Sequence, residues 1–165
     1  MSRKRPAPDI TVDVQVEAGA WPPAAGLRIL VGRAAAAAVA ATEVALAAQA
    51  EVSAVFTDDA HIRLLNREFR RRDGATNVLS FPGPKDPSGA FGPLLGDIVL
   101  ARETIEKEAE IEGIAVSDHV AHLIVHGFLH LLGYDHADEA EAAIMERLES
   151  AILADLGFPD PYADD

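Results

Sequence analysis

The spacing of hydrophobic residues changes from a strand pattern to a helix pattern within the first part of the chain. Residues 10–16 alternate between aliphatic and polar side chains, which is the period of a half-buried strand. An alanine-rich run then predicts a long helix from about residue 26 to residue 49. Alternation returns over residues 51–57 and predicts a second strand.

The middle of the chain predicts shorter elements. Asp58 or Asp59 can cap a helix that ends near Phe69. The segments expected after a charged loop are a strand over 77–81, a mobile glycine- and proline-rich loop over 83–93, a strand over 94–101 and a helix near 102–112.

The last part of the chain adds two helices. Ser117 is the expected N-cap of a histidine-rich helix, and a final helix is expected from about 138 to 156. Four strands and five helices without a repeat or linker indicate an α+β fold, in which a mixed four-stranded sheet packs against about five helices. We expect residues 1–8 to form a flexible tail and residues 9–162 to form a single domain.

Composition narrows the class of protein. The 165 residues are 49% hydrophobic and include no cysteine. A disulfide framework and thiolate ligands are therefore excluded, and histidine and carboxylate remain as strong metal ligands. The basic N-terminus is not followed by an apolar run, which argues against a signal peptide. The alanine-rich run contains Thr42, Glu43 and Gln49, so it predicts a buried or amphipathic helix of a soluble protein rather than a membrane span. The lack of cysteine is compatible with a reducing cytosol, and we expect a cytoplasmic protein.

The distribution of charge matters more than its sum. A net charge of −13 argues against a nucleic-acid partner. Within ten positions, however, the chain carries a group of arginines: Arg63, Arg67, Arg70, Arg71 and Arg72. This group is either a solvated helix face and loop or a local basic patch. Arginine suits a phosphodiester because its planar fork binds phosphate oxygens in pairs.

Three histidines in the stretch 126–136 have the spacing of a metal site. His126 and His130 are four apart, so they lie on one face of a helix. Gly133 can take the left-handed conformation that ends a helix, and the chain can then reverse and bring His136 to the same point. Three neutral nitrogen ligands with an open fourth position predict one zinc ion in a catalytic site.

Gly127 separates this pattern from that of the zinc peptidases. The spacing of the three histidines is also that of the metzincins, which have a glutamate directly after the first histidine. That glutamate is the general base for the zinc-bound water, and glycine cannot take a proton. Zinc could still lower the pKa of its water to about 7 and polarise an ester oxygen. The glycine therefore argues against proteolysis.

Other residues near the three histidines have more than one reading. Asp135 either orients a histidine or shuttles a proton, or it forms a turn through its side chain. His119 and His122 are expected at the surface, with a supporting role behind the metal ligands as the alternative. His61 is expected at the surface.

The chain resembles the bacterial YbeY family of metal-dependent endoribonucleases. The block with the strongest resemblance is His-Gly-Phe-Leu-His-Leu-Leu-Gly-Tyr-Asp-His at 126–136. Two further blocks agree in order and distance, namely Asn-Arg-Glu-Phe-Arg with Thr-Asn-Val-Leu-Ser-Phe-Pro (66–70 and 76–82), and Leu-Gly-Asp-Ile with Glu-Lys-Glu-Ala (95–98 and 106–109). The resemblance covers roughly residues 8–162.

This resemblance implies a function and roles for named residues. It implies a single-strand-specific RNA hydrolase that matures the 3′ end of the small-subunit ribosomal RNA and takes part in ribosome quality control. The implied partners are ribosomal RNA, the small ribosomal subunit and assembly factors, without a membrane. The implied roles are zinc binding by His126, His130 and His136 and a catalytic role for Arg70, which would hold RNA near the metal. From the residues themselves we add Asp135 as a weaker catalytic candidate and, as RNA-binding candidates, Arg67, Arg71 and Arg72.

Two departures from the family pattern lie beside the arginines, and two other functions stay open. The family commonly has Gly-Lys-Asp where this chain has Arg71-Arg72-Asp73, and a proline where it has Ala75. One alternative function is a metzincin-like zinc peptidase. The other is a non-catalytic ribosome-assembly factor whose zinc only braces the fold.

Overall fold

The computed structural model describes residues 9–163, and the predicted tail lies outside them. Its sheet has the strand order β1-β2-β4-β3. The strands β1 (Thr11–Val16), β2 (Glu51–Thr57) and β4 (Leu94–Ala101) are parallel, and β3 (Val78–Pro82) pairs antiparallel with β4 at one edge. The predicted mixed four-stranded sheet is therefore confirmed.

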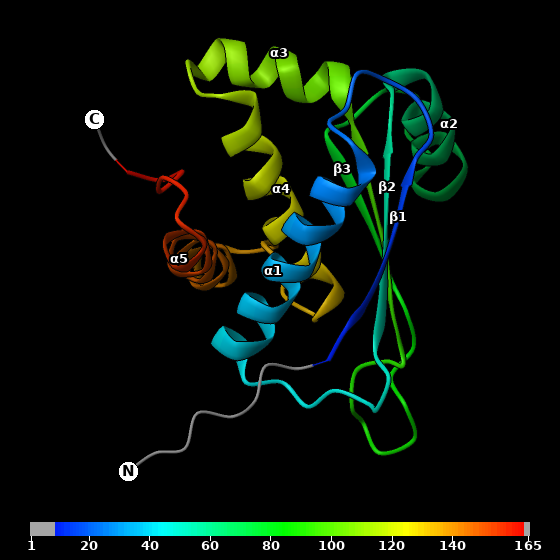
Figure 1. Cartoon of the computed structure of the whole chain (residues 1–165), viewed down its shortest axis with the longest axis vertical. Coiled ribbons are helices and arrows are strands. Elements are labelled where there is room, and N and C mark those ends of the chain that lie inside the picture. Colours follow the sequence, from blue (N-terminus) through cyan, green and yellow to red (C-terminus); the bar gives the residue numbers. More distant parts are fainter. Residues whose placement is uncertain (1–8, 164–165) are drawn as a thin grey trace.

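Five helices cover the sheet unequally (Figure 1). The helices α1 (Ala24–Thr42) and α4 (Val116–Leu131) pack on one face, with α5 (Glu139–Leu156) against them. The other face carries α2 (Asp59–Arg70), and α3 (Arg102–Glu112) lies across one end. The single α+β domain matches the prediction.

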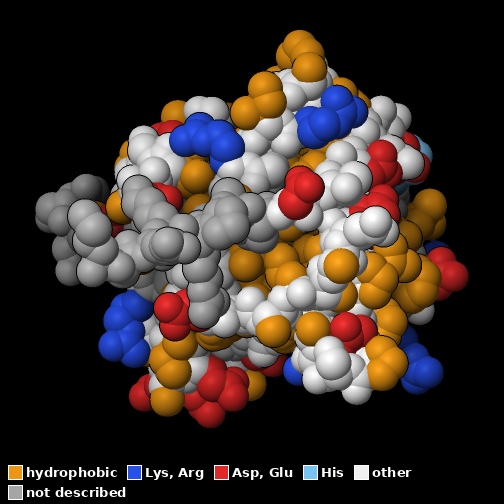
Figure 2. All heavy atoms as spheres, turned by 60° about the horizontal axis from the view of Figure 1, so that its bottom comes forward, with side chains coloured by type: hydrophobic (Ala, Val, Ile, Leu, Met, Phe, Trp, Pro, Cys, Tyr) orange, Lys and Arg blue, Asp and Glu red, His pale blue; other side chains and the backbone are white. Residues whose placement is uncertain are grey.

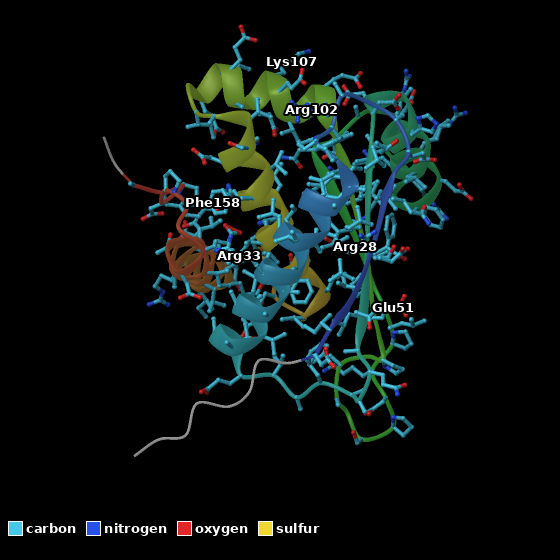
Figure 3. The ribbon with its side chains drawn as sticks, viewed as in Figure 1. Arg28, Arg33, Glu51, Arg102, Lys107 and Phe158 are labelled. Atoms are coloured by element: carbon cyan, nitrogen blue, oxygen red, sulfur yellow. The ribbon has the colours of Figure 1, made fainter. Side chains whose placement is uncertain are left out.

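The main core lies between the sheet and the helices α1, α4 and α5. Alternate residues of β2, such as Val52, Ala54 and Phe56, are fully buried on this face. Arg33 of α1 reaches the end of α5, where its Nη2 donates a hydrogen bond of 3.1 Å to the carbonyl of Leu156 (Figure 3). These contacts fix α4 between the sheet and α5, which positions the histidines that it carries.

The alanine-rich helix is shorter than predicted. α1 ends at Thr42, and Glu43 takes a left-handed conformation with φ of 54°. Leu46 then forms an isolated β-bridge with Phe91. Phe91 lies in the segment 83–93, which the sequence predicts as a mobile loop. Alanine favours a helix without marking its end, so a contact that is distant in sequence decides where α1 stops.

The two predicted N-caps differ in outcome. Asp58 caps α2 as expected, because its Oδ1 accepts a hydrogen bond of 3.0 Å from the backbone N–H of His61. The prediction for Ser117 was wrong: α4 begins at Val116, after Ala115, with no side-chain cap. The carbonyl of Ala115 already accepts from the backbone N–H groups in the first turn, so the helix starts without a polar cap.

The length and composition of α1 are those of a membrane span, and the bent pair α3–α4 passes the same test with a bend of 115°. The side chains of α1 nevertheless take part in the core of the domain. Leu27, Val31 and Ala35 are buried there, where α1 contacts α4 and α5.

Candidate metal centre

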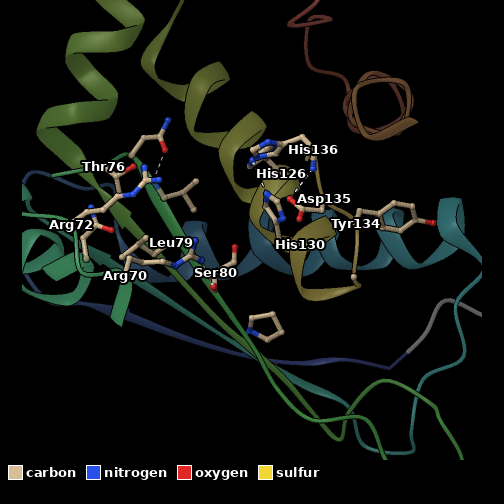
Figure 4. Close-up of a pocket in the computed structure, with 15 residues that line it drawn as sticks. Arg70, Arg72, Thr76, Leu79, Ser80, His126, His130, Tyr134, Asp135 and His136 are labelled. Atoms are coloured by element: carbon tan, nitrogen blue, oxygen red, sulfur yellow. Dashed lines mark hydrogen bonds between the residues drawn. The ribbon is translucent and has the colours of Figure 1, made fainter. Parts of the chain in front are cut away.

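The three predicted histidines come together at the end of α4. His126 and His130 lie one turn apart on this helix, which ends at Leu131. Gly133 has a φ of 91°, and the chain reverses there as predicted. His136 thereby reaches the other two rings, and one ligand nitrogen of each histidine lies within 4.8 Å of the others (Figure 4). This group could bind a metal ion.

The contacts of the histidines orient their ring nitrogens for metal binding. Nδ1 of His126 is 2.5 Å from Oε1 of Glu149, so this nitrogen donates a hydrogen bond to the carboxylate. Nε2 of His126 then carries the lone pair, and it lies at hydrogen-bond distance, 3.1 Å, from Nε2 of His130. Burial, followed by the neighbouring histidines, lowers the pKa of His130. The donor set therefore fits a zinc ion.

Glu149 is the residue of this site that sequence reasoning missed. Its side chain is almost fully buried, and its Oε2 is 2.9 Å from Nε2 of His122 and 2.5 Å from the hydroxyl of Tyr162. Burial alone would raise the pKa of Glu149, but hydrogen bonds from His122, His126 and Tyr162 lower it to about 2. Glu149 is therefore a carboxylate that accepts three hydrogen bonds.

One signal in the sequence could have indicated Glu149. The buried side chains of α5 include Met145, Ile152 and Leu153, and Glu149 stands on the same stripe. A carboxylate among apolar residues at helical spacing needs partners to be buried. The residues that supply them lie on α4 and in the C-terminal segment.

The surface positions expected for His119 and His122 were wrong. His119 is 5% exposed, and its Nε2 is 2.9 Å from Oε1 of Glu108. His122 is half-buried and shares Glu149 with His126. The alternative of a supporting role matches the position of His122. His61 is exposed, as predicted.

The histidines form one wall of a cleft of about 760 Å³, and arginines stand on the other (Figure 4). The arginine side is made by the end of α2, the loop after it and the edge strand β3. The cleft is lined by Asn66, Arg70, Arg72, Thr76, Asn77, Val78, Leu79, Ser80, Pro82, His126, His130, Gly133, Tyr134, Asp135 and His136. The structure therefore brings two of the predicted arginines to the same cavity as the three histidines.

The arginines differ in how they are placed. Arg70 is the last residue of α2, and its Nη2 donates a hydrogen bond of 3.3 Å to the carbonyl of Ser80. Arg72 also lines the cleft, whereas Arg67 and Arg71 do not. Arg71 has a φ of 55°, a left-handed conformation in which glycine has no steric penalty.

Gly127 allows α4 to approach the sheet closely. The hydroxyl of Ser80 donates a hydrogen bond of 3.0 Å to the carbonyl of Gly127. A Cβ atom at residue 127 would lie 3.0 Å from Cγ2 of Ile98 and 3.3 Å from Cγ2 of Val78. The position therefore faces packed strands, and a larger side chain there would have to displace its neighbours.

Asp135 makes a local contact beside the histidines. Its Oδ1 accepts a hydrogen bond of 2.8 Å from the backbone N–H of His136, and the residue is exposed in the cleft. This contact agrees with the interpretation that Asp135 forms a turn through its side chain. The carboxylate that contacts a histidine ring from behind is instead Glu149, on His126. A proton-transfer role for Asp135 stays a prediction.

The lining of the cleft does not share the negative net charge of the whole protein. Figure 2 shows a face on which Lys and Arg side chains stand apart from one another among acidic and hydrophobic groups. In the cleft, by contrast, Arg70 and Arg72 line one wall together, and Asp135 is the one acidic residue among those that line it. The cavity can therefore accept an anion even though the protein is acidic.

Comparisons with known proteins agree on one family. The family described as endoribonuclease YbeY matches residues 28–157. A protein named Endoribonuclease YbeY from Agrobacterium fabrum is 61% identical over 114 residues, which is 68% of each chain. Another with that name, from Allorhizobium ampelinum, is 50% identical over 159 residues, or 93% of this chain and 95% of the relative. The solution structure of TM1509 from Thermotoga maritima has the same fold, with a TM-score of 0.56 at 18% identity over 93% of this chain and 100% of the other.

Proposed function

This chain belongs to the family of the endoribonuclease YbeY, and we propose that it cuts single-stranded RNA with the help of one zinc ion. The observation that carries the proposal is the pairing of two groups across one cleft. Three histidine nitrogens converge on one wall, and Arg70 and Arg72 line the other. A phosphodiester next to the metal needs such positive charge, because charge grows on its oxygens in the transition state.

The residues in and behind the cleft have different proposed roles. His126, His130 and His136 would hold the zinc ion, and Glu149 fixes the orientation of the His126 ring from behind. When bound, zinc supplies a Lewis acid that polarises a phosphate oxygen and lowers the pKa of a water molecule. Arg70 binds the phosphate and offsets its charge, while Arg72 holds the neighbouring backbone.

Two attacking groups are compatible with this cleft. Either a water molecule attacks the phosphorus, or the 2′-hydroxyl of the substrate does. The second route produces a 2′,3′-cyclic phosphate, whereas hydrolysis by water leaves a linear phosphate on one product. Mass analysis of the ends of a cleaved oligonucleotide separates the two routes. Gly127 rules out a glutamate base at the metzincin position in either case.

The decisive experiment combines metal analysis with RNA cleavage. The wild-type protein should carry one zinc ion per chain and cut a single-stranded oligonucleotide but not the same strand in a duplex. His126→Ala should lose both zinc and cleavage. Arg70→Ala should keep zinc and cut RNA far more slowly. Arg28→Ala removes an exposed arginine from α1, which contributes no residue to the cleft, and should behave like the wild type.

Three results would contradict parts of the proposal. If Arg70→Ala cuts at the wild-type rate, the role of Arg70 is wrong. If His126→Ala retains zinc and activity, the metal centre is assigned to the wrong residues. If a peptide is cleaved by the wild type and not by His126→Ala, while RNA stays intact, the protein is a peptidase instead.

The proposal for the cellular substrate rests on family membership rather than on the shape of the cleft. We propose that the enzyme acts in the cytoplasm on the 3′ end of the small-subunit ribosomal RNA and in ribosome quality control, in contact with the small subunit and its assembly factors. Cells that lack the protein should accumulate small-subunit RNA with an extended 3′ end. The wild-type protein should restore the mature end, and Arg70→Ala should not.

A further inference from the structure

We propose that Glu149 and Tyr162 are positioning residues of the metal centre, which hold His126 in the tautomer that can bind the ion. The inference rests on the metal binding proposed above, not on the cleavage of RNA. It extends the site beyond its three ligands, to α5 and to the C-terminal segment.

Glu149 is placed as a buried acceptor rather than as a surface acid. It is 1% exposed, and its two oxygens face His122, His126 and Tyr162. A carboxylate is buried at a high free-energy cost unless charged partners or hydrogen bonds offset it. Hydrogen bonds from these three donors offset the cost of burying the carboxylate. Loss of one donor would therefore alter the contacts of Glu149 with the other two.

The contact with His126 selects one of its two neutral forms. A neutral imidazole has its proton either on Nδ1 or on Nε2. Nδ1 of His126 faces Oε1 of Glu149 at 2.5 Å, whereas Nε2 faces the other histidines. The carboxylate therefore keeps the proton on Nδ1 and leaves the Nε2 lone pair directed at the ion.

Tyr162 completes the support from a segment that lies after α5. Its hydroxyl donates a hydrogen bond of 2.5 Å to Oε2 of Glu149. Burial and then Glu149 itself raise the pKa of Tyr162, so the hydroxyl stays protonated as a donor. The segment is tied to α5 through Asp160, whose Oδ1 accepts from the hydroxyl of Ser150 at 2.7 Å and from the backbone N–H of Tyr162 at 2.9 Å. Phe158 packs on the main core just before it (Figure 3).

His122 explains why a carboxylate is needed here. It lies one turn before His126 on α4, and it contacts the other oxygen of Glu149 at 2.9 Å. An amide at residue 149 would present one acceptor oxygen where three donors compete. The variant Glu149→Gln therefore keeps the size of the side chain and removes its ability to serve both histidines.

The test measures tautomers and metal affinity rather than cleavage. In the metal-free wild type, ¹⁵N nuclear magnetic resonance should show the proton of His126 on Nδ1. Glu149→Gln should give a mixture of tautomers and bind zinc about 10- to 100-fold more weakly. Tyr162→Phe removes one hydrogen bond and should weaken zinc binding by about 2- to 10-fold. The control Glu139→Gln changes an exposed glutamate of the same helix and should match the wild type.

The outcomes separate this inference from the proposed function. Folded Glu149→Gln with the wild-type tautomer and zinc affinity overturns the inference. If Glu149→Gln does not fold, Tyr162→Phe decides, and wild-type zinc affinity in that variant also overturns the inference. If the wild type binds zinc as expected but does not cut RNA, the proposed function fails while the positioning role stands.

Discussion

The two walls of the cleft are held in opposite ways. On the histidine wall, His126 and His130 belong to a helix packed between the sheet and α5, and the support of His126 continues through Glu149 to Tyr162, while His136 lies in the exposed turn after the helix. The arginine wall stands at the exposed end of α2, where a 3.3 Å hydrogen bond from Arg70 to the Ser80 carbonyl ties the side chain to the edge strand. The first wall is thus held mainly by packing inside the domain, whereas the second is held by one hydrogen bond at the surface.

This difference suits the roles proposed for the two walls. A metal ion requires nitrogens at short, fixed distances, so a loosely held ligand lowers its affinity. A flexible RNA strand presents phosphates in varied positions, and long arginine side chains can follow them. We infer that the histidine side sets where the reaction occurs and the arginine side sets how firmly RNA is held there.

Removing a ligand from the histidine wall should have the largest effect. His130→Ala should lose zinc and all detectable RNA cleavage, because two histidines rarely suffice for a catalytic zinc site. Circular dichroism and the unfolding midpoint should show that the chain remains folded. His61→Ala, which alters an exposed histidine of α2, is the matched control. Unfolding of His130→Ala would instead favour a metal that only braces the fold.

Removing the anchored arginine should have the next largest effect. Arg70→Ala should lower kcat for RNA cleavage by about 10²- to 10³-fold, which is the range for losing one charged donor to a transition state. Arg70→Lys should recover part of this loss, because a lysine keeps the charge without the planar fork. Equal rates for the two variants would mean that the charge alone does not contribute, whereas a wild-type rate for Arg70→Lys would mean that paired hydrogen bonds from Arg70 do not contribute.

The remaining arginines should differ according to their position. Arg72 lines the cleft and Arg67 does not. Arg72→Ala should therefore weaken the binding of single-stranded RNA and reduce the slope of log Kd against log salt concentration by about 0.7, the loss of one phosphate contact. Arg67→Ala should leave the slope unchanged. Fluorescence anisotropy at several salt concentrations measures both, and equal slopes would remove the distinction between the two arginines.

The smallest expected effect concerns backbone strain on the arginine wall. Arg71 is left-handed, at a cost of about 1–2 kcal/mol for a residue with a Cβ. Glycine avoids that cost but loses about 0.5–1 kcal/mol of conformational freedom on folding. Arg71→Gly should therefore raise the free energy of unfolding by about 0.5–1 kcal/mol in chemical denaturation. Arg72→Gly is the control, because residue 72 is not among those with positive φ, and it should give no gain.

Sequence patterns predicted those parts of the molecule that depend on neighbours along the chain. His126 and His130 share a helix face through their spacing, and Gly133 supplies the turn that brings in His136, so the group could be found without a structure. The strands were found because their alternating residues face one buried layer.

The parts that were missed depend on contacts between distant segments. The end of α1 follows from the pairing of Leu46 with Phe91, and the burial of His119 follows from its contact with Glu108. Glu149 contacts a histidine 23 positions earlier, and its place on the apolar stripe of α5 indicates burial but not this partner. Local periodicity carries no information about such partners.

The tight packing at Gly127 also limits how this protein could change its chemistry. A single codon change could write a glutamate after His126, but its Cβ would already meet Ile98 and Ser80 at 3.0 and 3.2 Å. These neighbours would have to shift by a few tenths of an ångström, next to the hydrogen bond between the Ser80 hydroxyl and the Gly127 carbonyl. A glutamate at this position would therefore meet the packing between α4 and the strands before it could serve as a base.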